Sequence, residues 1–332
     1  MNNRDRFRAI LHFERVDRLP RFEWATWWDQ TITRWQGEGL PQSLLPEKHG
    51  VVQVMEFFGL DPVWQWWFPL MKPAYPTMPH GLGPVADMAD YERIRDLLYP
   101  EIDWAAAFPP LVRERHEKGE LAVWFTLDGY FWFARKLLGI ERHFYAFYDQ
   151  PDLLKRINED LLAYSKRVVT GLTNIIEPEF MTFGEDMSYN NGPMLSKATF
   201  DEFMAPYYRE LIPLITARNI VPIVDSDGNI EACIPWFTAC GVEGMLPFER
   251  QSGVDVVRIR RQTPRLRMIG GFDKMTMPHG TEAMRAEWER LLPVMRQGGF
   301  IPSVDHQTPP GVSIEQYRDY LALMWEYTEK AT

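Results

Sequence analysis

Four segments in the last third of the chain each read as a short apolar strand that runs directly into a carboxylate. They cover residues 220–224, 242–248, 266–272 and 300–304, and stretches with helical periodicity separate them. The acids that follow are Asp225, Asp227, Glu249, Asp273 and Asp305. Repeated βα units of this kind are typical of a parallel barrel, in which the loops after the strands build one site. Because charged groups are costly to desolvate, carboxylates that converge on one rim indicate a metal, a proton relay or a cationic substrate.

Earlier segments supply the remaining strands. Residues 18–24, 62–68, 121–127 and 179–183 bring the expected total to eight, and we expect helices over 4–13, 131–148 and 153–176. Capping-box patterns at Thr199 and Ser313 predict two further helix starts. The Pro-rich stretch 41–84 predicts loops and rim elements rather than a separate small domain. This order favours a single α/β domain over residues 1–332, a (β/α)8 TIM barrel with N-terminal helical and loop additions.

Composition and charge exclude several classes of function. The net charge is −10 and no long basic run occurs, which argues against nucleic-acid binding. No apolar run could span a bilayer, the N-terminus lacks an apolar signal core, and no dinucleotide or Walker motif follows a strand. The only two cysteines, Cys233 and Cys240, are expected to be plain buried thiols. We therefore expect a cytoplasmic protein, and the sequence leaves a homodimer open.

Asp227, Glu249 and His306 are the candidate metal ligands, with Asp225 beside them in the sequence. Carboxylate oxygens and an imidazole suit Zn²⁺ or another borderline or hard divalent ion. Such an ion would act as a Lewis acid on a substrate oxygen or carbonyl. Without a metal, the same carboxylates would repel one another and one would carry a raised pKa suited to proton transfer. The residues alone leave both alternatives open.

Other polar and aromatic residues are expected at the same strand ends. The catalytic candidates are Glu185, Asp186, Asp225 and Asp305, and the candidates for substrate binding are Glu23, Trp24, Trp28, Asp128 and Asp273. Each acid has a structural alternative, because acids after strands also cap the following helix. The tryptophans either close the barrel mouth or line a pocket for a flat organic ligand or a large ring cofactor.

Motifs along nearly the whole chain resemble the uroporphyrinogen decarboxylase superfamily. They are Arg4–Phe7, Val16–Pro20, Lys136–Gly139, Gly184–Asp186, Gly192–Ser196, Asp225–Gly228, Pro247–Glu249, Gly270–Asp273, Gly298–Ile301 and Asp305–His306. The superfamily contains uroporphyrinogen decarboxylases and cobalamin-dependent methyltransferases, and the resemblance implies a single (β/α)8 barrel. Decarboxylases of this type carry an arginine-rich N-terminal segment, whereas residues 21–28 here read RFEWATWW. A substrate with many carboxylates would therefore meet repulsion at this place.

Thiol-alkylating methyltransferases of the superfamily carry a His-x-Cys motif and a later cysteine, but here Asp225–Asp227 and Asp305 stand at those positions. The resemblance therefore implies the branch that moves a methyl group from a small donor, such as a methoxylated aromatic, to a corrinoid on a partner protein. In that reaction the metal polarises the ether oxygen and cobalt(I) attacks the methyl group. Two alternatives remain, a metal-free decarboxylase or lyase acting on a carboxylated substrate and a non-enzymatic barrel that binds a small molecule.

Overall fold

The centre of the molecule is one curled sheet of seven parallel strands. The structure is a computed structural model that describes residues 1–44, 51–172 and 174–332. The strand order is β1-β2-β3-β6-β7-β8-β9. The strands are β1 (Val63–Trp67), β2 (Ala122–Asp128), β3 (Phe180–Gly184), β6 (Val221–Asp225), β7 (Gly244–Leu246), β8 (Arg267–Phe272) and β9 (Phe300–Val304). Strands β4 (Ser188–Tyr189) and β5 (Gly192–Pro193) form a separate antiparallel pair.

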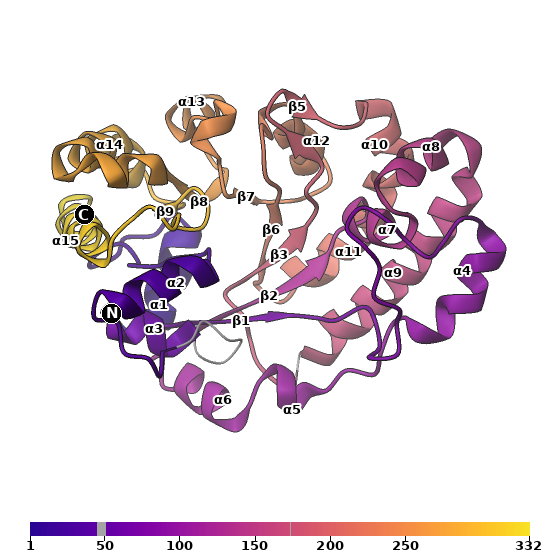
Figure 1. The fold of residues 1–332 in the computed structure, drawn as a ribbon, viewed down its shortest axis with the longest axis horizontal. Coiled ribbons are helices and arrows are strands. Elements are labelled where there is room, and N and C mark those ends of the chain that lie inside the picture. Colours follow the sequence, from indigo (N-terminus) through magenta and orange to yellow (C-terminus); the bar gives the residue numbers. More distant parts are fainter. Residues whose placement is uncertain (45–50, 173) are drawn as a thin grey trace.

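Helices surround the strands, and both termini lie on the same side of the molecule (Figure 1). The first group comprises α1 (Asn3–Leu11), α2 (Asp29–Gly37), α3 (Val51–Phe57), α4 (Met88–Ile94), α5 (Trp104–Ala107), α6 (Pro110–Glu117), α7 (Trp132–Leu138) and α8 (Ile140–Asp149). The second comprises α9 (Pro151–Leu172), α10 (Lys197–Phe203), α11 (Ala205–Thr216), α12 (Ile234–Thr238), α13 (Val256–Gln262), α14 (Thr281–Met295) and α15 (Ile314–Lys330). Strands β2 and β3 are buried along their whole length, as expected for a parallel sheet that is covered by helices on its outer face and packed inside.

The predicted eighth strand is wrong, and the sheet is not a fully closed barrel. Residues 18–24 form no strand, which leaves β1 and β9 as the two edges of the sheet. The segment still lies between these edges. The amide of Asp61 donates to the carbonyl of Arg21 at 2.8 Å, and the side chain of Glu23 accepts from Ser303 in β9. Pro20 has no N–H with which to form the hydrogen bonds of a strand. Residues 18–24 therefore occupy the space between β1 and β9 largely through side-chain contacts.

The register of the strands places three residues of the candidate site in one layer. Asp128 pairs with Gly184, and Gly184 pairs with Asp225, so these positions lie side by side at the carboxyl ends of β2, β3 and β6. Side chains alternate along each strand, and paired positions share a face. One step deeper, Thr126 hydrogen bonds to Thr182 at 2.7 Å. Asp128 and Asp225 therefore share the inward face with this hydroxyl pair.

Several predicted helix boundaries need correction. The helix expected over 131–148 is broken into α7 and α8 at Gly139, which has a φ of +82° and approaches the backbone of Gly81 closely. Thr199 begins no helix, because Ser196 caps α10 and accepts a hydrogen bond from the Thr199 amide. The capping box at Ser313 is confirmed. The helix predicted over 153–176 is observed as α9, which ends at Leu172. Residues 174–176 are not helical, and residue 173 lies outside the described residues.

Two further expectations from the sequence are met. Cys233 and Cys240 are both free and buried. Within the described part of the chain, no helix has the length and apolar character needed to cross a membrane.

Candidate metal and substrate site

Three side chains from distant parts of the sequence meet beyond the strand ends. Asp227 follows β6, Glu249 follows β7 and His306 follows β9. Each offers one possible ligand atom, and these atoms all lie within 4.8 Å of one another. Nε2 of His306 lies 3.6 Å from Oδ2 of Asp227. We call these three residues the carboxylate–histidine triad.

Neighbouring groups hold the triad in place. The amide of Gly228 donates to Glu249 at 2.9 Å, and the Ser252 hydroxyl donates to the same carboxylate oxygen at 3.4 Å. The imidazole of His306 meets the indole of Trp24 edge to face, with ring centroids 6.0 Å apart. Burial lowers the pKa of His306, but the hydrogen bond and charge of Asp227 outweigh it and the net shift is upward. Contacts that orient ligands in this way are typical of metal sites.

Two more carboxylates, Asp186 and Asp225, crowd the same rim. Oδ1 of Asp186 accepts from the amide of Asp227 at 3.3 Å, and Asp186 holds a φ of +39°, which is uncommon for a residue with a Cβ. Burial, and then the charge of Asp227, raises the pKa of Asp186 to about 6. Burial and the charges of Asp186 and Asp227 raise the pKa of Asp225 well above its usual range. The surroundings of Asp225 therefore favour its protonated form.

Asp305 and Asp273, by contrast, are engaged in hydrogen bonds or ion pairs with other residues of the chain. Asp305 is fully buried, accepts from the amide of Arg250 at 2.9 Å, and forms an ion pair with Lys274 at 3.3 Å. Asp273 caps the turn that follows β8, accepting from the Met275 amide at 2.9 Å. These contacts favour a structural role, in which both acids fix the loops beside the triad, over the predicted roles in catalysis and substrate binding.

Glu185 is also completely engaged by its own chain. Its buried carboxylate accepts hydrogen bonds from the amides of Tyr130 (2.9 Å) and Phe131 (2.9 Å), just before α7, from the first amide of α7 at Trp132 (3.2 Å), and from the hydroxyl of Tyr208. Burial raises its pKa to about 7 against the opposing effect of these donors. A carboxylate at a helix N-terminus satisfies amides that the helix itself leaves unpaired. The contacts therefore favour anchoring of α7 over the predicted catalytic role.

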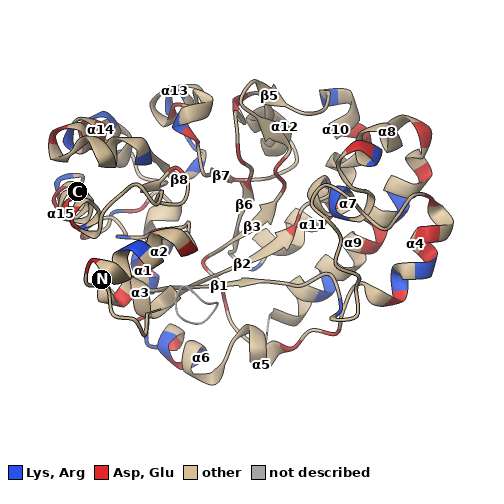
Figure 2. Ribbon diagram, in the orientation of Figure 1, with Lys and Arg blue, Asp and Glu red and all other residues tan. Residues whose placement is uncertain are grey.

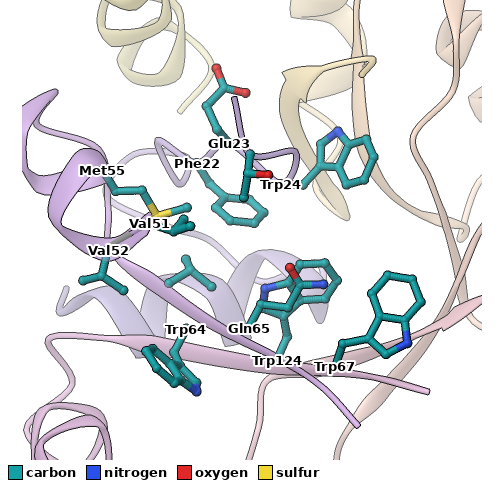
Figure 3. A pocket seen from close by; sticks show the side chains of 12 residues that line it. Phe22, Glu23, Trp24, Val51, Val52, Met55, Trp64, Gln65, Trp67 and Trp124 are labelled. Atoms are coloured by element: carbon teal, nitrogen blue, oxygen red, sulfur yellow. The ribbon is translucent and has the colours of Figure 1, made fainter. Parts of the chain in front are cut away.

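Glu23 belongs to residues 18–24, and its side chain is buried against β9. It accepts from the Ser303 hydroxyl at 2.7 Å and from the Val304 amide at 3.3 Å. Its carboxylate points away from the rings of Phe22 and Trp24 (Figure 3) and accepts from the Tyr317 hydroxyl at 3.4 Å. Burial raises its pKa to about 7 although its hydrogen bonds act in the opposite direction. Its hydrogen bonds join residues 18–24 to the sheet. Glu23 also lines the aromatic cavity against β1, so its predicted contact with substrate stays a prediction.

The raised pKa of Glu23 predicts a pH-dependent stability. Between the unfolded value of 4.5 and the folded value of about 7, the folded state retains a proton that the unfolded state has lost. The free energy of unfolding should therefore fall as pH rises through this window, by up to about 3 kcal/mol from this group. Glu23→Gln should flatten the dependence, as measured by urea denaturation at pH 5 and pH 7.5. Exposed Glu14→Gln is the control, and an unchanged slope in Glu23→Gln would refute the assignment.

A cavity of about 230 Å³ lies against β1, and none of the three triad residues is part of its lining. Its lining is mostly apolar and aromatic, and it includes Phe22, Trp24, Met55, Trp67 and Trp124 (Figure 3). Trp24 also donates to the carbonyl of Val304 at 2.7 Å and contacts His306, so one indole touches both the cavity and the triad. An apolar cavity with a few polar groups at its edge is the usual form of a small-molecule site.

Trp67 lines the same cavity, and Asp128 holds its indole in place. The Trp67 indole donates to Asp128 at 2.8 Å, and Lys136 donates to the other oxygen of Asp128 at 2.7 Å. A side chain at Gly184 would collide with the Trp67 ring, so this glycine lets the indole lie across the strand end. Asp128 thus orients the indole of Trp67, which lines the cavity. Trp28 is 41% exposed and is not among the cavity-lining residues, so the structure does not bring this candidate into the pocket.

Sequence reasoning missed basic residues near the site. Lys136 holds Asp128, and the guanidinium of Arg135 reaches the carbonyl of Asp186 at 3.5 Å. Both lie on α7, whereas the candidates predicted from the sequence lie at the ends of strands. The position of this helix directly after Asp128 could have indicated both residues, since a barrel site includes the helices that begin at its rim.

A curled parallel sheet with its polar residues gathered at the carboxyl ends defines an α/β protein of the barrel type. Residues 73–327 match the family described as Uroporphyrinogen decarboxylase (URO-D), and the chain belongs to this family. The membership predicted from the motifs is therefore confirmed. No curated protein sequence matches this chain significantly.

Solved structures resemble this fold at low sequence identity. A methyltransferase from Methanosarcina mazei aligns with a TM-score of 0.70 and 16% identity, covering 98% of this chain and 99% of the other. An L-ribulose 3-epimerase aligns with a TM-score of 0.48 and 10% identity, covering 88% and 92% of the two chains. A D-psicose 3-epimerase from Clostridium cellulolyticum gives 0.47 and 10%, covering 90% and 97%. The first of these similarities supports the fold over the whole chain.

Proposed function

We propose that this protein is a metal-assisted methyltransferase. It would move a methyl group from a small donor, such as a methoxylated aromatic, to a corrinoid carried by a separate protein. The observation that carries the proposal is the carboxylate–histidine triad together with an aromatic cavity, with Trp24 in contact with both. Family membership and the fold shared with a methyltransferase add support.

The triad residues fit a divalent metal ion. Their ligand atoms lie within 4.8 Å of one another, and two ligands of a tetrahedral Zn²⁺ stand roughly 3.3 Å apart, so small side-chain rotations suffice. Two oxygens and one imidazole nitrogen suit Zn²⁺ and leave a position for substrate. When bound, the ion would supply Lewis-acid polarisation of the donor's ether oxygen.

The chain's own residues would perform the remaining tasks. The rings of Trp24 and Trp67 would hold a flat donor, and the apolar lining would exclude water from it. Asp225 would hold a proton at its carboxyl group for transfer to the departing oxygen, consistent with its raised pKa. Asp186 would keep Asp227 in place through the backbone amide of that residue.

The alternative is a decarboxylase or lyase acting on a carboxylated substrate, the activity after which the family is named. Asp186, Asp225 and Asp227 bring several carboxylates to one rim, and these would repel a substrate that is itself rich in carboxylates. The geometry therefore favours methyl transfer.

A paired assay separates the two functions. Purified protein loaded with Zn²⁺ is incubated with cob(I)alamin and a panel of methoxylated aromatics, and formation of methylcobalamin is followed by its absorbance. The same preparations are assayed for release of CO₂ from aromatic and tetrapyrrole carboxylates. We expect methyl transfer that depends on Zn²⁺. Release of CO₂ without methyl transfer would overturn the proposal in favour of the alternative.

A further inference from the structure

A second cavity, of about 440 Å³, lies between the loop after β1 and the start of α7 and α8. Its lining combines apolar and aromatic side chains with basic ones. The lining includes Lys72, Tyr75, Met78, Trp132, Arg135 and Lys136. Among the described lining residues none is acidic, although the chain as a whole carries a net charge of −10. Figure 2 shows basic residues on α7.

The walls of this cavity are held in place by the backbone. Lys72 donates its amide to the carbonyl of Leu97 at 2.9 Å, and the amide of Ile140 donates to the carbonyl of Gly81 at 2.9 Å. Gly139 lies so close to the Gly81 backbone that a Cβ there would stand 2.7 Å from its carbonyl oxygen. Both ends of the loop are thus fixed against the helices, so a ligand would enter a site that is already formed.

Arg135 is the cation in this cavity with the fewest internal partners. Lys136 is paired with Asp128 at 2.7 Å, and Lys72 donates to the carbonyl of Asp96 at 2.7 Å. The guanidinium of Arg135 instead lies over the indole of Trp132, 5.2 Å from the ring centroid. A cation within about 6 Å of an aromatic face is attracted to it. Its hydrogen bond is the long contact to the carbonyl of Asp186 at 3.5 Å, and among the described residues no carboxylate forms an ion pair with it.

Tyr75 also belongs to the lining of this cavity. The hydroxyl oxygen of Tyr75 is buried and has no hydrogen-bond partner among the described residues. Such atoms are uncommon in folded proteins, and an unplaced water or ligand is one way in which their hydrogen bonding is completed. Arg135 itself offers several donors in a planar arrangement.

We propose that this cavity binds a small aromatic anion, with its charged group at Arg135 and its ring against Trp132 and the neighbouring apolar side chains. A planar guanidinium matches a carboxylate or a phosphate, so the shared requirement is an anionic group on a flat apolar body. The site is distinct from the carboxylate–histidine triad, and the inference does not depend on the proposed methyl transfer.

Isothermal titration calorimetry with three probes of similar size tests the site. We expect benzoate or phenyl phosphate to bind at least about 10-fold more tightly than neutral benzyl alcohol, because only the anions can bond to Arg135. The two anions distinguish a carboxylate from a phosphate site. Equal affinity for all three probes would overturn the proposal.

Variants place the binding in this cavity. Arg135→Gln should remove the preference for anions, and Arg135→Lys should restore part of it, because the charge is kept but the fork is lost. Met78→Trp should fill the cavity and weaken binding of every probe. Arg142→Gln, at an exposed arginine on α8, is the matched control and should bind like the parent protein. Anion affinity that survives both Arg135→Gln and Met78→Trp in folded protein would refute the assignment.

Discussion

Replacing His306 with alanine is expected to weaken Zn²⁺ binding by at least about 100-fold and to abolish metal-dependent methyl transfer. Loss of an outer-shell partner alone typically costs 10–100-fold, and removing one of three protein ligands should cost no less. The change leaves Asp227 and Glu249, whose carboxylates lie close together and would repel each other without the imidazole. Competition with a chromogenic zinc chelator measures the affinity.

Two comparisons make this result specific. His279→Ala removes an exposed histidine in the turn after β8, and it should leave the Zn²⁺ affinity unchanged. Glu249→Gln retains the size of the side chain but removes the charge, and it should weaken binding alongside His306→Ala. If His306→Ala binds Zn²⁺ as tightly as the parent protein, the ion is held elsewhere.

Replacing Glu185 with alanine is expected to destabilise the fold by about 3–5 kcal/mol. The substitution strips one buried acceptor group from three backbone amides at and just before the start of α7 and from the Tyr208 hydroxyl. Each buried donor left without a partner costs about 1–3 kcal/mol, partly offset because burying the carboxylate is itself unfavourable. Urea denaturation followed by circular dichroism measures the change.

The control for this variant is Glu202→Ala, which removes a solvent-exposed glutamate whose partner is Lys155. Exposed ion pairs contribute about 0–1 kcal/mol, so this change should be nearly neutral. A Glu185→Ala protein that is as stable as the control but catalytically inactive would instead assign Glu185 to catalysis.

The strands that the sequence predicted well are those buried on both faces. Residues 121–127, 179–183 and 300–304 are apolar runs bounded by turn residues, and β2, β3 and β9 follow them closely. Residues 18–24 mimic this pattern, yet they form no strand, because Pro20 cannot donate to a ladder and Glu23 turns its side chain toward β9. The helix expected from Thr199 fails because two hydroxyls compete for one cap, and Ser196 takes it.

The gathering of acids at one rim followed from topology, since the carboxyl ends of parallel strands face the same way. Sequence alone could not separate the acids that face the mouth from those bound to the chain. Asp305 and Asp227 look alike in the sequence, but Asp305 is buried against Lys274 whereas Asp227 lies beside His306. That distinction depends on loop conformations, which set partners that are far apart in the sequence.

Zinc X-ray absorption spectroscopy on protein loaded to one equivalent tests the central claim most directly. If Asp227, Glu249 and His306 bind a single ion, the spectrum should show only nitrogen and oxygen neighbours at about 2.0–2.2 Å, including the pattern of one imidazole. Sulfur scattering at about 2.3 Å would instead place the ion at Cys233 or Cys240. That result, or a failure to retain one equivalent of Zn²⁺, would contradict the account.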